Sequence, residues 1–446
     1  MPPPPRPPPS AVPYPTRTPA PNLRATLRLL RLEPRARLFF GSYAQSALGN
    51  GAGYVALVVL AYQAWHSPWA ISLVLLADFL PAMLFGPLFG AAADRWSRRR
   101  IAIISDLARA VAFIGIAFVG GIWAIIGFAL LAGAGAGLFT PAILAALPSL
   151  VEEERLPAAT SLYGALTDAG RAIGPALAGL GLLVASPEAV AAANGITFLL
   201  SAVVLGMVKF GGTPEGASER AGLLREAREG ITATARMSGI RVLIGASSGL
   251  LLFAAMLNVT ELLVAEDLGS GDTGYSVLVA AAGIGFVAGS LAGANGAPIA
   301  ELKRRYIGGI LVMALGIALF AIAPVFVLAL LGLGLTGVGN GLLLTHERLI
   351  FQKVVPDRLL GRAFALADTA GSWAFAVAFV GAGAALAQVG ETALLLGASG
   401  GAAVICLWAA YALRTTWEDA APEPVYAVSS SAGAELPAST ARSASV

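Results

Sequence analysis

The chain has 446 residues, of which 57% are apolar and only 12% charged, and its formal net charge is +3. Soluble domains carry about 25% charged residues, so this composition excludes an ordinary soluble protein and indicates many membrane spans of about 20 residues. The basic residues lie in short loops and tails rather than in one patch, which argues against a nucleic-acid partner.

Residues 1–37 are predicted to form a disordered cytoplasmic tail. Their proline-rich start lacks the apolar core of a secretory signal peptide. Residues 414–446 are rich in serine, alanine and proline, and they are predicted to form a second disordered cytoplasmic tail.

Twelve apolar segments between the tails are long enough to span a membrane. Six lie in the first half of the chain, at 38–64, 69–92, 101–121, 123–149, 158–185 and 187–208. Six lie in the second half, at 241–265, 274–297, 305–323, 325–347, 360–386 and 391–413. Backbone groups in hydrocarbon must be hydrogen-bonded internally, so these segments are expected to be helices. The predicted fold is an all-α membrane protein with two six-helix bundles, residues 38–208 and 241–413.

The distribution of positive charge supports an even number of spans. Of the 29 Lys and Arg residues, 27 fall in the tails or on one side of the predicted membrane, and only Arg109 and Arg171 lie well inside spans. Positively charged loops stay on the cytoplasmic side. Both termini are therefore expected in the cytoplasm.

The loop between the second and third spans runs from Gly86 to Arg100 and reads GPLFGAAADRWSRRR. Small residues four apart, such as Gly86 and Gly90, allow two membrane helices to approach closely. The acid Asp94 is then followed by a cluster of arginines, which indicates a cytoplasmic loop. A plain stop-transfer loop is the alternative interpretation.

This loop resembles the Gly-x-x-x-Asp-Arg-x-x-Arg-Arg motif of major facilitator superfamily transporters, which joins their second and third helices. The resemblance implies a latch that holds neighbouring helices together in the outward-facing state. The matching residues are Gly90, Asp94, Arg95, Arg98 and Arg99.

Two Asp-x-x-Arg pairs lie inside predicted spans, Asp106 with Arg109 and Asp168 with Arg171. Residues three apart share a helix face, so each pair can partly neutralise itself. A structural role and a transport role are both open for these four residues. Asp106 and Arg109 follow closely after the basic loop and are assigned to the latch.

Three further carboxyl groups, Asp78, Glu261 and Asp368, have no opposite charge at helical spacing in their own spans. Removal from water favours the neutral form of such a group, as proton transport near neutral pH requires. Asp78 lies near the middle of its span and is the leading candidate for proton coupling. Asp168, Arg171, Glu261 and Asp368 are the other candidates. Pairing of Asp78 with an arginine from another helix is the structural alternative.

The fifth span carries Gly170, Gly174, Pro175 and Gly179. This spacing resembles the Gly-x-x-x-Gly-Pro-x-x-Gly motif of proton-coupled drug exporters, except that Ala178 stands before the last glycine. Proline removes a backbone donor and glycine permits close packing, so a bent and tightly fitted helix is expected. Ordinary use of glycine and proline in a membrane helix is the alternative.

The two bundles are separated by a polar linker, residues 209–240. Its segment 223–233 has charged and apolar residues at helical spacing, which predicts an amphipathic helix on the inner membrane surface or a partner-binding segment. Farther along the chain, Glu347 and Arg348 are expected to form ion pairs at the cytoplasmic end of the tenth span.

The sequence lacks the nucleotide-binding motif Gly-x-x-x-x-Gly-Lys-Ser/Thr, so no ATPase activity is expected. The single cysteine, Cys406, and only two histidines argue against a disulfide and against a metal cluster. The protein is therefore predicted to be no enzyme, to need no cofactor or metal, and to draw on the proton gradient.

Within the superfamily, the likeness is to bacterial drug and siderophore exporters of the macrolide-efflux and enterobactin-exporter type. It implies a monomeric transporter in the bacterial plasma membrane that exports a small, largely apolar compound in exchange for protons. Ala-Ile-Leu after Pro141 departs from the polar residue common in relatives, which weakens the case for a charged substrate. Siderophore export, nutrient import, and a membrane sensor or assembly protein are the alternatives.

Overall fold

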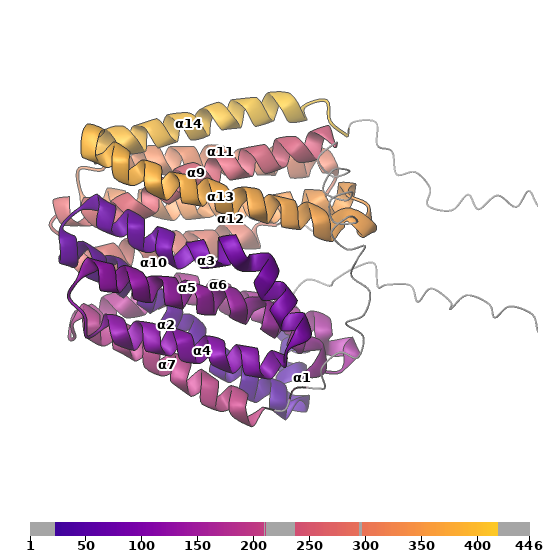
Figure 1. Ribbon diagram of the computed structural model, residues 1–446. Coiled ribbons are helices and arrows are strands. Elements are labelled where there is room, and N and C mark those ends of the chain that lie inside the picture. The colour runs from indigo at the N-terminus through magenta and orange to yellow at the C-terminus, as the bar shows by residue number, and fades with distance from the viewer. Residues whose placement is uncertain (1–22, 209, 211–236, 294–296, 418–446) are drawn as a thin grey trace, which may run out of the picture.

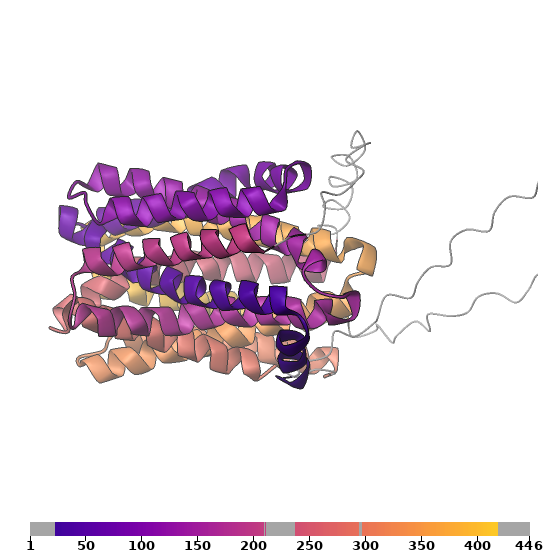
Figure 2. The same cartoon turned by 90° about the horizontal axis from the view of Figure 1, so that it is seen from below.

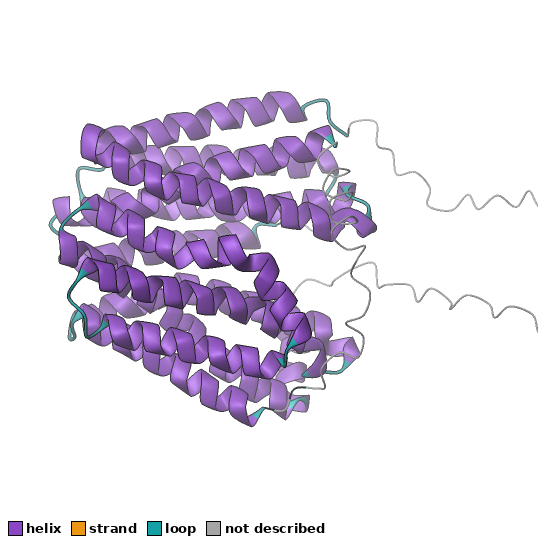
Figure 3. Ribbon diagram, in the orientation of Figure 1, coloured by secondary structure: helices purple, strands orange, loops and turns teal. Residues whose placement is uncertain are grey.

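The computed structural model describes residues 23–208, 210, 237–293 and 297–417. Within these ranges all regular secondary structure is helical, and the connections are short loops (Figure 3). The predicted amphipathic helix at 223–233 and the tail from residue 418 onward lie outside the described residues.

Among the described residues, twelve long helices follow a short first helix, α1 (Leu23–Leu32). The first six are α2 (Pro34–Trp65), α3 (Pro68–Arg95), α4 (Arg98–Ile116), α5 (Ile122–Ala146), α6 (Leu156–Leu182) and α7 (Pro187–Met207). The second six are α9 (Ser238–Asp267), α10 (Gly271–Leu291), α11 (Ile299–Ala321), α12 (Phe326–Val354), α13 (Asp357–Val389) and α14 (Glu391–Leu413). Two 3₁₀ turns, Leu147–Ser149 and Glu153–Arg155, connect α5 to α6.

The lengths of these helices suit a bilayer. They run from 19 residues in α4 to 33 in α13, and a rise of about 1.5 Å per residue makes 20 residues span about 30 Å. In the part of the chain that the structure describes, ten helices are long and apolar enough to cross a membrane. The other two, α4 and α6, carry the two Asp-x-x-Arg pairs, yet α4 packs on α5 and α7, and α6 packs on α2 and α10. The chain is a multi-pass membrane protein.

Local signals set several helix ends. Pro34, Pro68 and Pro187 occupy the first turns of α2, α3 and α7, where the missing N–H has no helical partner to lose. Ser67 accepts a hydrogen bond from the Trp69 amide at 3.3 Å and thereby caps α3. These residues explain why the predicted span boundaries are close to the observed ones.

The helices form two groups that lie side by side (Figure 1). The first half, α2 to α7, is coloured indigo to magenta, and the second half, α9 to α14, rose through orange to yellow. We call the end of the bundle where α2 begins and α14 ends the terminal end, and the opposite end the far end. The basic loop between α3 and α4 lies at the terminal end.

The two halves make contact toward the far end. The Gln63 side chain of α2 donates a hydrogen bond to Asp272 of α10, at 3.1 Å. The ring of Phe79 on α3 lies 5.9 Å from that of Phe375 and 5.8 Å from that of Phe379, both on α13. These contacts join the halves between the far end and the middle of the bundle.

The predicted disorder of residues 1–37 is wrong for residues 23–37. Leu23–Leu32 form α1, and α2 begins at Pro34, four residues before the predicted span. The apolar and charged residues of α1 alternate at helical spacing, which is the sequence signal for this helix. In the structure Leu29 is fully buried against the first half.

Candidate functional site

The basic loop contacts helices of its own half. Arg98 donates a hydrogen bond to the carbonyl of Ala145 at 2.6 Å, and Arg99 donates one to the carbonyl of Leu205 at 3.0 Å. Both carbonyls belong to last turns, where helix carbonyls lack helical partners and a positive charge is favourable. Arg95 is exposed, and the Asp94 side chain lies outside the described residues. In this state the two arginines therefore cap the ends of α5 and α7.

The predicted close approach of helices at Gly86 and Gly90 is not observed. A Cβ atom added to either glycine would meet no heavy atom within 4 Å. The tight contact of α3 lies instead on α5, where a Cβ on Gly137 would lie 2.8 Å from the Phe89 ring and one on Gly133 would overlap the backbone carbonyl of Asp78. The spacing of glycines in α3 alone could not show that the small residues at the contact of α3 with α5 belong to α5.

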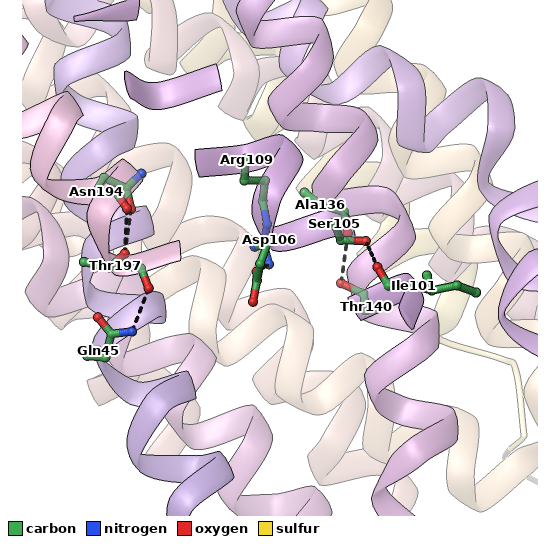
Figure 4. A network of polar contacts seen from close by, with 9 residues as sticks. All are labelled: Gln45, Ile101, Ser105, Asp106, Arg109, Ala136, Thr140, Asn194 and Thr197. Atoms are coloured by element: carbon green, nitrogen blue, oxygen red, sulfur yellow. Dashed lines mark hydrogen bonds and ion pairs between the residues drawn. The ribbon is translucent and has the colours of Figure 1, made fainter. Parts of the chain in front are cut away.

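Asp106 and Arg109 form an ion pair buried within the first half. The guanidinium carbon of Arg109 lies 4.2 Å from the ring centres of both Phe139 on α5 and Phe198 on α7. Figure 4 shows Arg109 directed along α4 toward Asp106, away from the Asn194, Thr197 and Gln45 contacts. The self-neutralisation predicted for this pair is therefore observed. The pair lies among α4, α5 and α7, and its assignment to the latch stays a prediction.

Asp78 lies beside this buried pair. Its backbone carbonyl faces Gly133 of α5, and its carboxyl group lies within electrostatic range of Arg109. The Asp78 side chain is half-buried. The structure thus brings the leading proton-coupling candidate to the one arginine buried inside the first half of the described chain.

A second candidate, Glu261 of α9, approaches the same region from the other half. The phenol of Tyr54 on α2 lies near both Asp78 and Glu261, and beside the hydroxyl of Tyr275 on α10. Glu261 is 5% exposed, and the Tyr275 hydroxyl is buried without a hydrogen-bond partner among the described residues. Carboxyl groups from opposite halves are therefore both within electrostatic range of one tyrosine.

The remaining candidates lie elsewhere. Asp168 and Arg171 of α6 form no ion pair within 4 Å in the described part of the chain, unlike Asp106 and Arg109. Asp168 lies within electrostatic range of Arg348, which α12 contributes from the second half. Arg171, Arg348 and Asp368 are exposed. The structure does not bring Asp368 to the Tyr54 region, because Asp368 lies near the opposite end of α13 from Phe379.

The glycines of α6 form tight contacts on two sides. A Cβ on Gly174 would lie 2.7 Å from the Cα of Gly51 on α2, and a Cβ on Gly179 would lie 3.0 Å from Ser276 on α10. The Cα of Ala172 would lie 2.5 Å from a Cβ on Gly283 of α10. The helix continues through Pro175 from Leu156 to Leu182. The motif thus fits α6 closely between α2 of its own half and α10 of the other half.

The family description of the Major Facilitator Superfamily matches residues 39–379, most of the chain. The chain belongs to the Major Facilitator Superfamily. The transporter fold and function expected from the loop motif are thereby confirmed at the level of the superfamily.

Curated members of the superfamily with related sequences include named exporters. The putative bacilysin exporter BacE of Bacillus subtilis is 26% identical over 76% of this chain and 85% of its own length. Macrolide efflux protein A of Streptococcus pyogenes is 24% identical over 70% of this chain and 80% of its own length. The enterobactin exporter EntS of Escherichia coli is 26% identical over 75% of this chain and 81% of its own length.

Solved superfamily structures share the fold. A bacterial homologue of the lysosomal transporter Spinster, in an inward-facing and unoccupied conformation, gives a TM-score of 0.64 at 12% identity, covering 85% of this chain and 95% of its own. The nucleoside transporter NupG gives a TM-score of 0.68 at 12% identity, and the match covers 85% of this chain and 99% of NupG. At this identity the likeness concerns the fold alone.

One buried network in this superfamily member was not predicted from the sequence. Glu347 of α12 is 6% exposed and accepts a hydrogen bond from Ser247 of α9 at 2.8 Å. The Ser247 and Tyr306 hydroxyls lie 3.0 Å apart. The predicted cytoplasmic ion pair of Glu347 is therefore wrong. Tyr275 and Tyr306 were not predicted as site residues, because a tyrosine in an apolar span looks like a packing residue.

Proposed function

We propose that this protein exports a small, largely apolar compound from the cytoplasm in exchange for protons. Three of its relatives carry exporter or efflux names, which supports the direction of transport. The proposal that the compound is apolar is supported by the rings of Phe79, Phe375 and Phe379, which meet where the halves join. We take the monomer as the working unit.

Proton coupling is assigned to Asp78, with Glu261 as its counterpart in the second half. The supporting observation is that both carboxyl groups lie near Tyr54, at the contact between the halves. A proton on Asp78 would remove its attraction to Arg109 and lower the cost of keeping the carboxyl group away from water. Because protonation changes these interactions, it would shift the balance between the two orientations of the halves.

The state described here is proposed to open toward the cytoplasm. The halves meet toward the far end, whereas Arg348 and Asp368 are exposed closer to the terminal end. Charged side chains inside a span are costly against lipid, which favours an aqueous opening around them. The basic loops at the terminal end favour its cytoplasmic location in a bacterial plasma membrane.

The test uses the purified protein in liposomes with a pH-sensitive dye inside and a macrolide as the probe, the compound class named for one relative. We expect macrolide movement in one direction to drive proton movement in the other. Asp78→Asn should abolish proton movement, because asparagine cannot exchange the proton. Asp368→Asn removes an exposed carboxyl group outside the Tyr54 region and serves as the matched control.

Three outcomes would contradict the proposal. Proton movement that is unchanged in Asp78→Asn would remove this residue as the carrier. Movement of macrolide and protons in the same direction would contradict export in exchange for protons and would indicate uptake instead. Loss of coupling in Asp368→Asn but not in Asp78→Asn would move the coupling site to α13.

A further inference from the structure

The short helix α1 lies outside the bundle of spans. A single residue, Glu33, separates its end at Leu32 from the start of α2 at Pro34. Figure 2 shows α1, the darkest indigo segment, turned across the direction of the long helices at the terminal end of the bundle. Because α2 is a membrane span, this short connection keeps α1 at the level of the membrane surface.

The faces of α1 differ in character. Leu29 is fully buried and Leu30 is half-buried, both against a cluster of the first half that includes Phe39 and Tyr43. On the opposite side Leu27 is 50% exposed and Leu32 is 49% exposed. Arg28 and Arg31 are exposed between these leucines, since residues three and four apart share a helix face.

The charge of α1 is of one sign. Its sequence, LRATLRLLRL, holds three arginines and no acidic residue. A row of arginines flanked by exposed leucines suits the boundary between headgroups and acyl chains, where leucine contacts the acyl chains and arginine contacts phosphate. We propose that α1 is a docking surface for anionic phospholipid headgroups, bound through Arg28 and Arg31.

The α1 helix is connected by an ion pair to the start of α6, a helix that contacts both halves. Glu33 forms an ion pair with Arg155, which also pairs with Glu152 at 3.0 Å. Arg155 directly precedes the first residue of α6, and α6 packs against α10 of the second half. Lipid bound to α1 is therefore mechanically connected to the start of a helix that lies between the two halves.

The experiment measures lipid contact of the full-length chain, independently of transport. In a Cys406→Ser background the chain has no cysteine, so Leu27→Cys introduces one site for an environment-sensitive fluorophore. The protein is reconstituted in phosphatidylcholine liposomes with and without phosphatidylglycerol. We expect the emission of the fluorophore to shift to the blue and to be quenched by brominated lipid. Both effects should increase with the phosphatidylglycerol content and decrease with added salt, because the attraction is electrostatic. A label at Leu32→Cys should respond in the same way.

Arginine substitutions test the assignment. One basic residue near an anionic surface contributes about fivefold in lipid affinity, so Arg28→Gln should raise the phosphatidylglycerol fraction needed for half the shift by about that factor. In the double variant Arg28→Gln/Arg31→Gln, the fluorescence response should no longer depend on the phosphatidylglycerol content. Arg304→Gln removes the same charge from an exposed position of α11 in the other half, and it should leave the response unchanged.

Two outcomes overturn the proposal. Labels at positions 27 and 32 that report water in both lipid mixtures would show that α1 does not contact the bilayer. An equal loss of response in Arg304→Gln and Arg28→Gln would show that overall charge, and not α1, causes the effect.

Discussion

The guanidinium of Arg109 is held by one carboxylate and two aromatic rings, all supplied within the first half. Asp106 pairs with it along the same helix, while Phe139 and Phe198 cover it from α5 and α7. Arginine is suited to this site because its planar group can pair with a carboxylate and stack on rings at the same time. The pair therefore fixes the arrangement of three helices near Asp78.

Removal of one partner should be more harmful than removal of both. Arg109→Gln leaves Asp106 buried without compensation, and breaking a buried pair in this way costs about 3–5 kcal/mol. Adding Asp106→Asn removes the isolated charge and should restore part of the lost stability. The apparent unfolding midpoint of the purified protein in detergent measures both effects. A double variant that unfolds at a lower temperature than Arg109→Gln would contradict this account.

Helix α5 is shaped by glycines that face two neighbours in turn. Gly133 and Gly137 face α3, whereas a Cβ on Gly135 would lie 2.8 Å from the Arg109 side chain on α4. Small residues permit this approach because membrane helices associate through close packing rather than through the hydrophobic effect. The position of Asp78 relative to Arg109 thus depends on the absence of side chains from one face of α5.

The substitution Gly133→Ala tests this dependence. The new methyl group would overlap the backbone carbonyl of Asp78, which cannot rotate away, so α3 and α5 must separate. We expect a lower unfolding midpoint and impaired transport. Gly127→Ala is the matched control on the same helix, because its Cβ meets nothing within 4 Å and alanine favours helix more than glycine does. Equal effects of the two substitutions would show that helix propensity alone is involved.

On the scale of the whole molecule, the two halves meet toward the far end, and we call this contact the closure. A Cβ on Gly383 of α13 would lie 2.9 Å from the Ser72 hydroxyl of α3. If the halves rock during transport, as we propose, this contact must open in every cycle.

A disulfide across the closure should therefore stop transport. Ser72→Cys with Gly383→Cys, in a Cys406→Ser background, is the pair to test. A Cβ at position 383 would lie 2.9 Å from the Ser72 hydroxyl oxygen, and disulfides need Cβ atoms about 3.5–4.5 Å apart. Transport should be lost on oxidation and recovered on reduction. Ser72→Cys with Gly381→Cys should not cross-link, because position 381 meets nothing within 4 Å. Full transport by a completely cross-linked protein would contradict the rocking of the halves.

The sequence by itself determined the helices and the superfamily, and it predicts the side of the membrane on which the basic loops lie. These follow from the length of apolar runs and the position of charges, which depend on the bilayer rather than on neighbouring helices. The start of α7 at Pro187 and the end of α14 at Leu413 were predicted to the residue. The α1 helix was missed because it is short and follows a proline-rich segment.

Only the tertiary structure decided which side chains meet. Membrane helices are apolar on nearly all sides, so their sequence pattern does not show which face turns toward which neighbour. The pairing of Arg98 and Arg99 with carbonyls, the contact of Gly133 with Asp78, and the approach of Asp78 and Glu261 to Tyr54 all join residues from different helices. The one contact that the sequence did predict, Asp106 with Arg109, lies within a single helix, where the spacing of residues alone sets the distance.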